Sequence, residues 1–195
     1  MKKWIVIAIV LLIGFLIYLK ITGFYNKAII QKEDAKGQWS KVESAYQRRS
    51  DLIPNLVNTV KGYADFEQET LIGVTNARAS ATQTKIDPTN ITPDQLAKFQ
   101  EAQAGLSSAL SRLLVSVEKY PDLKANENFL ALQSQLEGTE NRIKVERDRF
   151  NDSVIIYNKF LQTFPNNILA GFFHLAEMGY FQAVAGSENA PVVKF

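Results

Sequence analysis

The sequence predicts an all-α fold in which an N-terminal transmembrane helix is followed by an antiparallel four-helix bundle. Three observations lead to this prediction. The chain has only 10 Gly and 6 Pro in 195 residues, too few for a turn-rich β fold. A charge-free apolar run stands near the N-terminus. Beyond it, apolar residues recur at steps of three and four, which is the spacing of one helix face.

The composition excludes several functional classes. The 22 Lys and Arg against 20 Asp and Glu leave a net charge of +2, so no basic field is available to attract nucleic acid. The absence of cysteine excludes disulfides, Cys-ligated zinc, a thiol nucleophile and a lipid-modified cysteine anchor. The single histidine, His174, excludes paired-His metal chemistry. Nucleotide-binding, zinc-hydrolase and serine-hydrolase motifs are missing as well. We therefore expect no catalytic residue, no cofactor, no metal and no enzymatic activity.

The apolar run predicts a membrane anchor over residues 1–24. Residues 4–19 carry no charge, and apolar residues beyond them lengthen the run toward the ~20 residues that cross a bilayer as a helix. Trp4 and Tyr25 lie near its two ends, where aromatic side chains favour the membrane interface. A cleaved signal peptide and a buried core helix are the alternatives. A small-x-small cleavage site is missing after the run, which favours the anchor.

The charges around the anchor only weakly predict its orientation. Lys2 and Lys3 precede the run, and Lys20, Lys27 and Lys32 follow it, so the positive-inside rule is nearly balanced. A short start with two lysines is typical of a signal anchor. We therefore expect a single-pass protein with its N-terminus inside and its bundle on the outer side of the cytoplasmic membrane.

Four amphipathic helices are predicted over residues 25–49, 51–82, 93–119 and 124–163, so that residues 25–164 form the bundle. Ser50 or Asp51 would cap the second helix and place Pro54 in its first turn. Because the apolar spacing runs unbroken through Pro54, one kinked helix is the alternative. Thr92 and the proline after it predict the start of the third helix. The apolar stripes comprise Trp39, Val42, Tyr46, Ile53, Leu56, Val60, Tyr63, Leu71, Val74, Ala81, Leu96, Phe99, Leu106, Leu110, Leu113, Val117, Phe129, Leu132, Leu136, Ile143, Phe150, Val154, Tyr157, Leu161 and Phe164.

The last segment, residues 165–195, is predicted to be an aromatic-rich tail. If four helices alternate in direction, the fourth returns toward the membrane. Phe172 and Phe173 would then lie at the level of the lipid headgroups, which aromatic rings favour. Packing of the tail on the base of the bundle is the alternative. Residues 186–195 are predicted to be frayed.

Four charged residues interrupt the apolar stripes. Glu67 and Arg78 fall among the apolar residues of the second helix, and Glu140 and Arg147 among those of the fourth. We predict that they form a paired polar layer inside the bundle, the charged seam, which would fix helix register. Two alternatives stay open: the four residues edge the stripe and extend into water, or they form a ligand site.

Two motifs carry a family resemblance. Residues 48–56 read RRSDLIPNL, and residues 118–125 read EKYPDLKA. With the aromatic and charged positions around them, they resemble the LemA family over about residues 1–173. The resemblance implies one N-terminal transmembrane helix, a four-helix bundle and a bacterial membrane protein without assigned activity. It supplies no catalytic residue.

These observations predict a membrane-anchored helical scaffold that binds another protein or itself. Its expected partners are the lipid bilayer, a second copy of the chain and another membrane protein, but not nucleic acid. Two rival hypotheses are kept. One is a hydrolase that uses the carboxylate of Glu67 or Glu140. The other is a membrane-remodelling or lipid-contacting protein that inserts its aromatic tail into lipid.

Overall fold

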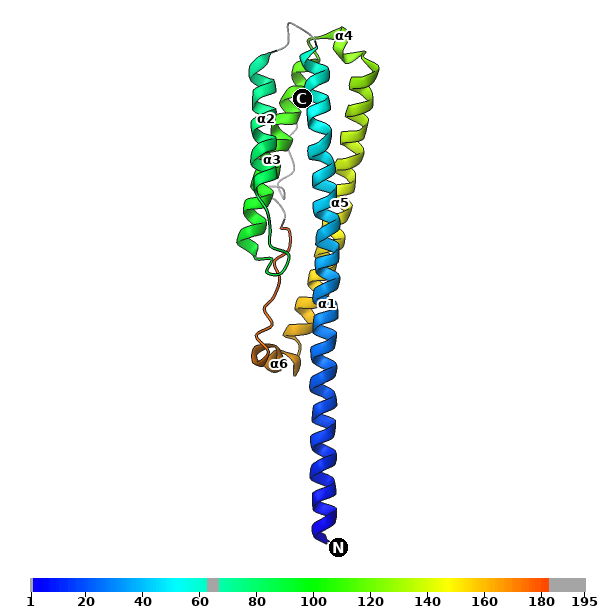
Figure 1. The fold of residues 1–195 in the computed structure, drawn as a ribbon, viewed down its shortest axis with the longest axis vertical. Coiled ribbons are helices and arrows are strands. Elements are labelled where there is room, and N and C mark those ends of the chain that lie inside the picture. Colours follow the sequence, from blue (N-terminus) through cyan, green and yellow to red (C-terminus); the bar gives the residue numbers. More distant parts are fainter. Residues whose placement is uncertain (1, 63–66, 183–195) are drawn as a thin grey trace, which may run out of the picture. The chain divides into compact units, whose positions relative to one another are not determined.

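The computed structural model describes residues 2–62 and 67–182, and its regular elements in those ranges are all helices. They are α1 (Lys2–Lys61), α2 (Gln68–Gln83), α3 (Pro93–Val117), α4 (Pro121–Lys124), α5 (Glu127–Gln162) and α6 (Asn166–Phe172), drawn in Figure 1. The predicted all-α class with a long apolar N-terminal helix is confirmed. Tyr63, assigned to a predicted stripe, and residues 186–195, predicted to be frayed, lie outside the described residues. Phe164, also assigned to a predicted stripe, is 80% exposed because α5 ends at Gln162, so that assignment is wrong.

Helix α1 is continuous from the apolar segment through Pro54. The predicted helix break at residues 50 and 51 is therefore wrong, and the alternative of one helix through Pro54 fits. The helix predicted over residues 51–82 is wrong as well, because its residues are divided between α1 and α2. A proline inside a helix lacks the N–H that would bond to the carbonyl four residues earlier, here that of Ser50. Arg78 of α2 supplies the missing donor, because its Nε donates to the Ser50 carbonyl oxygen at 2.9 Å. A tertiary contact thus offsets part of what Pro54 costs the helix.

The buried side chains of α1 explain why the helix does not stop. Eight of them follow a strict alternation of three- and four-residue steps, so that one narrow face stays in contact with the protein interior over many turns. The positions are Ala35, Trp39, Val42, Tyr46, Arg49, Ile53, Leu56 and Val60, each 7% exposed or less. A helix that ended at residue 50 would divide this face.

The described chain divides into two compact units. Unit 1 comprises Met1–Ala45 and Arg142–Met178, and unit 2 comprises Tyr46–Asn141 and Gly179–Phe195. Helices α1 and α5, with 60 and 36 residues, contribute to both units, whereas the shorter α2 and α3, with 16 and 25 residues, belong to unit 2.

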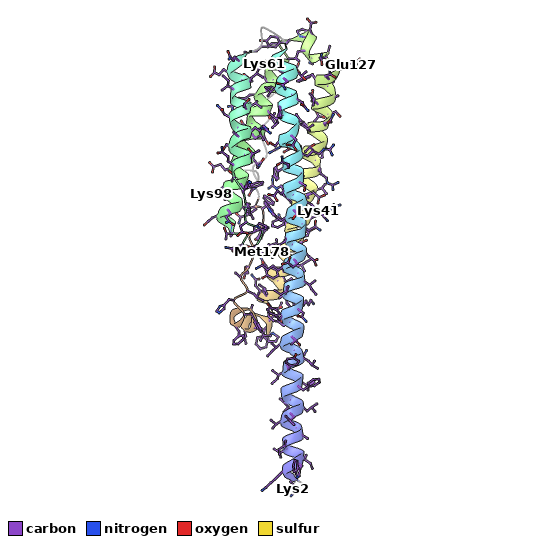
Figure 2. All side chains as sticks on the ribbon, in the orientation of Figure 1. Lys2, Lys41, Lys61, Lys98, Glu127 and Met178 are labelled. Carbon is purple, nitrogen blue, oxygen red and sulfur yellow. The ribbon has the colours of Figure 1, made fainter. Side chains whose placement is uncertain are left out.

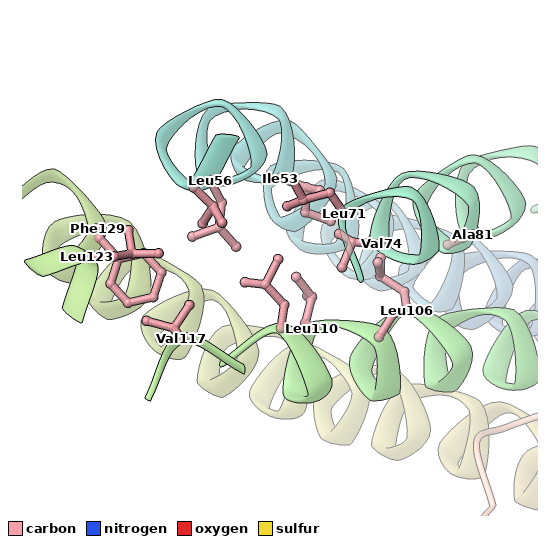
Figure 3. Close-up of a cluster of buried hydrophobic side chains, with 13 residues drawn as sticks. Ile53, Leu56, Leu71, Val74, Ala81, Leu106, Leu110, Val117, Leu123 and Phe129 are labelled. Carbon is pink, nitrogen blue, oxygen red and sulfur yellow. The ribbon is translucent and has the colours of Figure 1, made fainter. Parts of the chain in front are cut away.

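Unit 2 is built around one apolar cluster to which α1, α2, α3, α4 and α5 all contribute (Figure 3). Helix α3 begins as predicted. The Thr92 hydroxyl accepts from the backbone N–H of Gln95, the Gln95 side chain accepts from the backbone N–H of Thr92, and Pro93 occupies the first helical position. The cluster comprises Ile53, Leu56, Val60, Leu71, Val74, Ala81, Leu106, Ala109, Leu110, Leu113, Val117, Leu123 and Phe129.

Unit 1 is built from α1, α5 and α6, and its core is rich in aromatic rings. The rings of Trp39 and Phe150 meet edge to face with centroids 5.4 Å apart. The rings of Phe24 and Phe160 stack at 5.4 Å. Both distances lie in the range preferred by aromatic pairs, and all four side chains come from the facing helices α1 and α5.

After α6 the chain runs as a return segment, residues 174–182, which is held by hydrogen bonds to its backbone. In unit 1 the Asn158 side chain donates to the Met178 carbonyl at 2.8 Å and accepts from the Met178 N–H at 2.9 Å. The Tyr157 hydroxyl donates to the Ala176 carbonyl at 3.1 Å. In unit 2 the Gly179 N–H donates to the Ile91 carbonyl at 2.8 Å.

Gly179 allows the close approach of two backbones. A Cβ at this position would lie 2.7 Å from the Pro93 nitrogen and 2.8 Å from the Thr92 carbonyl carbon.

We expect Gly179→Ala to lower the free energy of unfolding by about 1–3 kcal/mol, because the backbone of residues 92 and 93 must move to make room for the Cβ. Gly105→Ala in α3 is the matched control, since a Cβ there meets nothing within 4 Å. The control should gain about 0.5–1 kcal/mol from higher helix propensity. Chemical unfolding in detergent, followed by circular dichroism, measures both. Equal effects of the two substitutions would contradict the close approach.

Burial raises the pKa of the Tyr157 hydroxyl above its ordinary value. A raised folded-state pKa gives stability that is present below pH ~10, the unfolded pKa of tyrosine, and is lost as the pH rises through the folded pKa. Ionisation also removes the proton that bonds the return segment. We expect Tyr157→Phe to cost about 1 kcal/mol at neutral pH, and this difference to shrink above pH ~10. Thermal unfolding across this pH range measures it, with Tyr180→Phe as the control for the substitution. A difference independent of pH would contradict the assignment.

Candidate functional site

The N-terminal part of α1 is a bare apolar surface. All side chains of residues 2–19 are exposed (Figure 2). Trp4, predicted at the membrane interface, is 77% exposed near the start of the helix. Exposure of so long a run of large apolar side chains to water is unfavourable in free energy and is rare in soluble monomers. By length and composition, α1 is a helix that can cross a membrane. The structure thus supports the predicted anchor.

An aromatic cluster lies where α1 leaves this apolar surface. Phe24 stacks on Phe173 at 6.4 Å, and Tyr25 contacts the same ring at 5.1 Å. Phe172 meets Phe173 edge to face at 5.2 Å. The structure therefore brings together Tyr25, Phe172 and Phe173, three of the four residues predicted at the membrane interface. Phe173 is partly buried at the centre of the cluster, whereas Phe172 lies at its edge and is 76% exposed.

A buried arginine is the centre of a polar network in unit 2, the Arg49 cluster (Arg49, Gln103, Ser107 and Glu140). Arg49 is 2% exposed although it carries a charge. Its Nη1 donates to Glu140 Oε2 at 2.9 Å and to Ser107 Oγ at 3.0 Å, and its Nη2 donates to Gln103 Oε1. The guanidinium also lies 5.2 Å from the centre of the Tyr46 ring. One cation thus orders side chains from α1, α3 and α5.

The cluster extends to α2 through Gln103. The Gln103 Nε2 donates to the Ala81 carbonyl at 3.2 Å. Ala81 lies in the last turn of α2, where carbonyl groups have no partner within the helix. Gln103 therefore satisfies the end of one helix while it accepts from Arg49. With the bond from Arg78 to the Ser50 carbonyl, these contacts tie together polar groups from every long helix of unit 2.

The predicted charged seam has different contacts. Glu67 pairs with Lys119 at 3.1 Å, and this hydrogen bond and charge lower the pKa of the Glu67 carboxyl. Arg78 donates to the Ser50 carbonyl, and Glu140 pairs with Arg49. These three residues thus contact partners outside the predicted set. Arg147 belongs to unit 1, whereas the other three belong to unit 2.

The helical phase of α5 explains why sequence reasoning selected Glu140 and Arg147. Leu136, Ile143 and Phe150 follow one another at intervals of seven residues. Within each interval, the residue at plus three or the one at plus four can lie on the same helix face. The structure buries the positions at plus three. These are Thr139, 5% exposed, and Glu146, 0% exposed. The side chain of Glu140, at plus four, is 55% exposed.

Sequence reasoning also missed Arg49, although a signal was present. Arg49 stands three residues after Tyr46 and four before Ile53, inside the unbroken repeat of α1. The predicted helix end at residue 49 assigned it to a helix terminus. Without that break, the same spacing places it among core residues.

Glu146 is the buried acid of unit 1. Its Oε1 lies 2.7 Å from Arg142 Nε and 3.2 Å from Arg149 Nη1, and both arginine side chains are largely exposed. Its Oε2 is buried without a hydrogen-bond partner. The two arginines lie on the same helix as Glu146, and their positive charges compensate the negative charge of its carboxylate. Within residues 2–62 and 67–182, no group of three or more His, Asp or Glu side chains is placed to hold a metal ion.

Comparison with known proteins agrees with the sequence motifs. The LemA family model matches residues 38–195. The chain belongs to the LemA family. The match extends beyond residue 173, where the sequence resemblance was expected to end. The LemA match therefore includes the return segment and the helices from residue 38 onward, but not residues 1–37 of the expected resemblance.

Curated relatives place this LemA-family chain among bacterial proteins. It is 25% identical over 182 residues to "Protein LemA" of Metamycoplasma hominis, covering 93% of this chain and 79% of that protein. It is 27% identical over 174 residues to "Magnetosome protein MamQ" of Magnetospirillum gryphiswaldense, covering 80% and 64%. "Magnetosome protein MamQ 2" of Paramagnetospirillum magneticum is 26% identical over 175 residues, covering 81% and 64%. The chain spans 64% of the length of either MamQ protein. Together with the apolar helix, these likenesses fit a membrane-associated helical protein.

Arg49 and Glu140 make an asymmetric pair that a double-mutant cycle can test. Glu140→Ala strands a buried cation, so we expect a loss of roughly 2–3 kcal/mol in the free energy of unfolding. Arg49→Met should cost only about 1 kcal/mol, because an apolar side chain fills the site and Glu140 turns to water. In the Arg49→Met background, Glu140→Ala should cost under ~0.5 kcal/mol. The exposed Glu137→Ala on the same helix is the control. Additive losses would show that the two charges are not coupled.

Proposed function

We propose that this LemA-family protein is a non-enzymatic scaffold anchored by one transmembrane helix in a bacterial cell membrane, with its helical units on the periplasmic side. The continuity of α1 carries the proposal. One helix of about 90 Å, from its 1.5 Å rise per residue, contains both the apolar segment and the core face of Ala35 to Val60. Because the helix is continuous, the anchor and the core face belong to one element. A helical core attached directly to a membrane helix suits a protein that presents a surface to partners.

We infer that the four long helices of unit 2 are arranged as an antiparallel bundle. Support comes from the shared apolar cluster, to which α1, α2, α3 and α5 contribute, and from the Arg49 cluster, which contacts side chains or carbonyls of the same four helices. A buried polar residue at a core position specifies helix register, which apolar packing alone leaves loosely defined.

The charge pattern favours the scaffold over the hydrolase hypothesis. A carboxylate acting as a general acid needs a pKa raised toward neutral pH. Glu67 lines a cavity of about 590 Å³ together with Arg112, but Lys119 lowers the pKa of its carboxyl. Glu140 pairs with Arg49. Both carboxylates therefore have the contacts of ion pairs and lack the environment of a proton donor.

The outer face of α3 is the surface that we propose for self-association. Residues 95–111 carry only two charged side chains, Lys98 and Glu101. Gln95 takes part in the helix cap, so the usable face begins after it. Ala104, Gly105, Ser108 and Ser111 are exposed, and Val115 is 69% exposed. Small and uncharged side chains allow a second copy to approach without a large desolvation cost.

Because the sequence lacks cysteine, one introduced thiol reports on this surface. We expect Ser108→Cys to form a disulfide or bismaleimide crosslink between copies in native membranes. Ser134→Cys, an exposed serine on α5, is the matched control and should crosslink weakly. Gel mobility of the full-length protein measures both. Equal crosslinking at the two sites, or none at Ser108→Cys across a wide range of expression, would contradict self-association through α3.

A lipid-contacting function of the tail is the second candidate. Phe164, Ile168 and Phe172 are 80%, 64% and 76% exposed, in or next to the short helix α6. Exposed apolar side chains beside an anchor helix favour insertion into the membrane interface.

Quenching by lipids tests this second candidate. A fluorophore on Ile168→Cys should be quenched by brominated lipid chains, because the side chain would lie in or beside the acyl region. The same fluorophore on Ser134→Cys is the control. Quenching at residue 168 no stronger than at residue 134 would contradict lipid contact.

A further inference from the structure

A groove lies between the anchor helix and α6, within unit 1. Its volume is about 470 Å³, within the range of roughly 300–1,000 Å³ typical of ligand pockets. Apart from one lysine, its lining is apolar. The lining residues are Ile13, Leu16, Ile17, Lys20 and Ile21 of α1, with Pro165, Ile168 and Leu169 at the start of α6.

The sequence spacing accounts for the two walls. The lining residues of α1 recur at steps of three and four, so they share one face of the helix. Those of α6 also lie three and four residues apart. The wall formed by α1 belongs to the same bare surface that crosses the membrane in the proposed function. Ile13, Leu16 and Ile17 are 51%, 52% and 53% exposed.

An apolar groove at this depth needs an apolar occupant. In the hydrocarbon region water is absent, and an empty groove would deprive its walls of dispersion contacts. The most abundant flexible apolar molecule there is the acyl chain of a lipid. An acyl chain along this wall would extend from Ile21 to Ile13, a length of about 12 Å at a helical rise of 1.5 Å per residue.

Lys20 gives the groove a polar end. It is the one charged residue among those that line the groove, and it lies on the side toward the protein units. Lysine near the end of a transmembrane helix extends toward the headgroup layer. In the described part of the chain, Lys20 takes part in no ion pair. Its ammonium is therefore available to a phosphate, whose negative charge it complements.

We propose that the groove binds one bilayer phospholipid, with an acyl chain between α1 and α6 and the phosphate paired to Lys20. The proposal rests on the proposed membrane anchoring and specifies the lipid contact of the tail. Bound lipid would fill the space between α6 and the anchor and hold the exposed side chain of Ile168 against an apolar neighbour. The tail would then dock on the anchor through a lipid molecule as well as through the aromatic cluster.

Lipid retention tests the proposal on the full chain. The protein is purified in mild detergent from vesicles of phosphatidylglycerol mixed with an equal amount of the matching diacylglycerol, and bound lipid is counted by native mass spectrometry. We expect one phosphatidylglycerol per chain. Leu16→Trp fills the groove and should lower retention by roughly fivefold or more. Leu11→Trp is the matched control, because it makes the same change on another face of the apolar segment, and it should retain lipid.

The headgroup contact is tested separately. Lys20→Gln should abolish the preference for phosphatidylglycerol over diacylglycerol, while Lys32→Gln, outside the groove, should preserve it. Leu169→Trp fills the groove from the opposite wall and decides the result if Leu16→Trp fails to fold by circular dichroism. Retention unchanged by either tryptophan would overturn the proposal. So would bound detergent in place of lipid, or efficient crosslinking of Leu16→Cys between copies without bound lipid.

Alkaline carbonate extraction separates this proposal from the proposed function. If the protein stays with the membrane but both tryptophan variants retain lipid as the unaltered chain does, the groove proposal fails and the anchor stands. If the unaltered chain is itself extracted, the anchoring fails, and the lipid site fails with it.

Discussion

The unbroken core face of α1 is the constraint on which the rest of the structure depends. Its three- and four-residue steps continue from Ala35 to Val60, so the helix cannot end between them without dividing a buried surface. Pro54 is tolerated within this helix because Arg78 donates to the carbonyl that the proline leaves without a partner. A contact from α2 thus supports the geometry of α1. The same helix contains both the apolar segment and this core face.

Two charged residues occupy core positions at which apolar side chains would be expected. Arg49 occupies a core position of α1, and Glu146 occupies one of α5. A buried charge tolerates few arrangements of its neighbours, because each donor or acceptor must find a partner. Arg49 meets this requirement with Glu140, Ser107 and Gln103, and Glu146 meets it in part with two arginines of its own helix. We therefore propose that both residues specify helix register.

The sequence predicted the features that depend on local rules and missed those that depend on a tertiary partner. The all-α class, the apolar helix and the cap at Thr92 follow from composition, length and short-range spacing. The predicted break before Pro54 applied a correct local rule, and a donor from another helix overrode it. The spacing on α5 left open whether Thr139 or Glu140 is buried, because Leu136 and Ile143 can be connected by a step of three followed by four or by a step of four followed by three. The close approach at Gly179 involves residues far apart in the chain, so no local pattern reveals it.

The anchor and the tail present the same energetic problem. Residues 2–19 expose large apolar side chains along α1, and Phe164, Ile168 and Phe172 expose them around α6. In water, exposing either set of apolar side chains would carry a hydrophobic cost. The two surfaces are neighbours, because Phe172 contacts Phe173, and Phe173 packs on Phe24 and Tyr25. A soluble protein would bury these surfaces against each other, yet a groove separates part of them. If the tail contacts lipid as proposed, the bilayer would remove the cost of both surfaces at once, and a single environment would account for the bare helix, the exposed tail and the space between them.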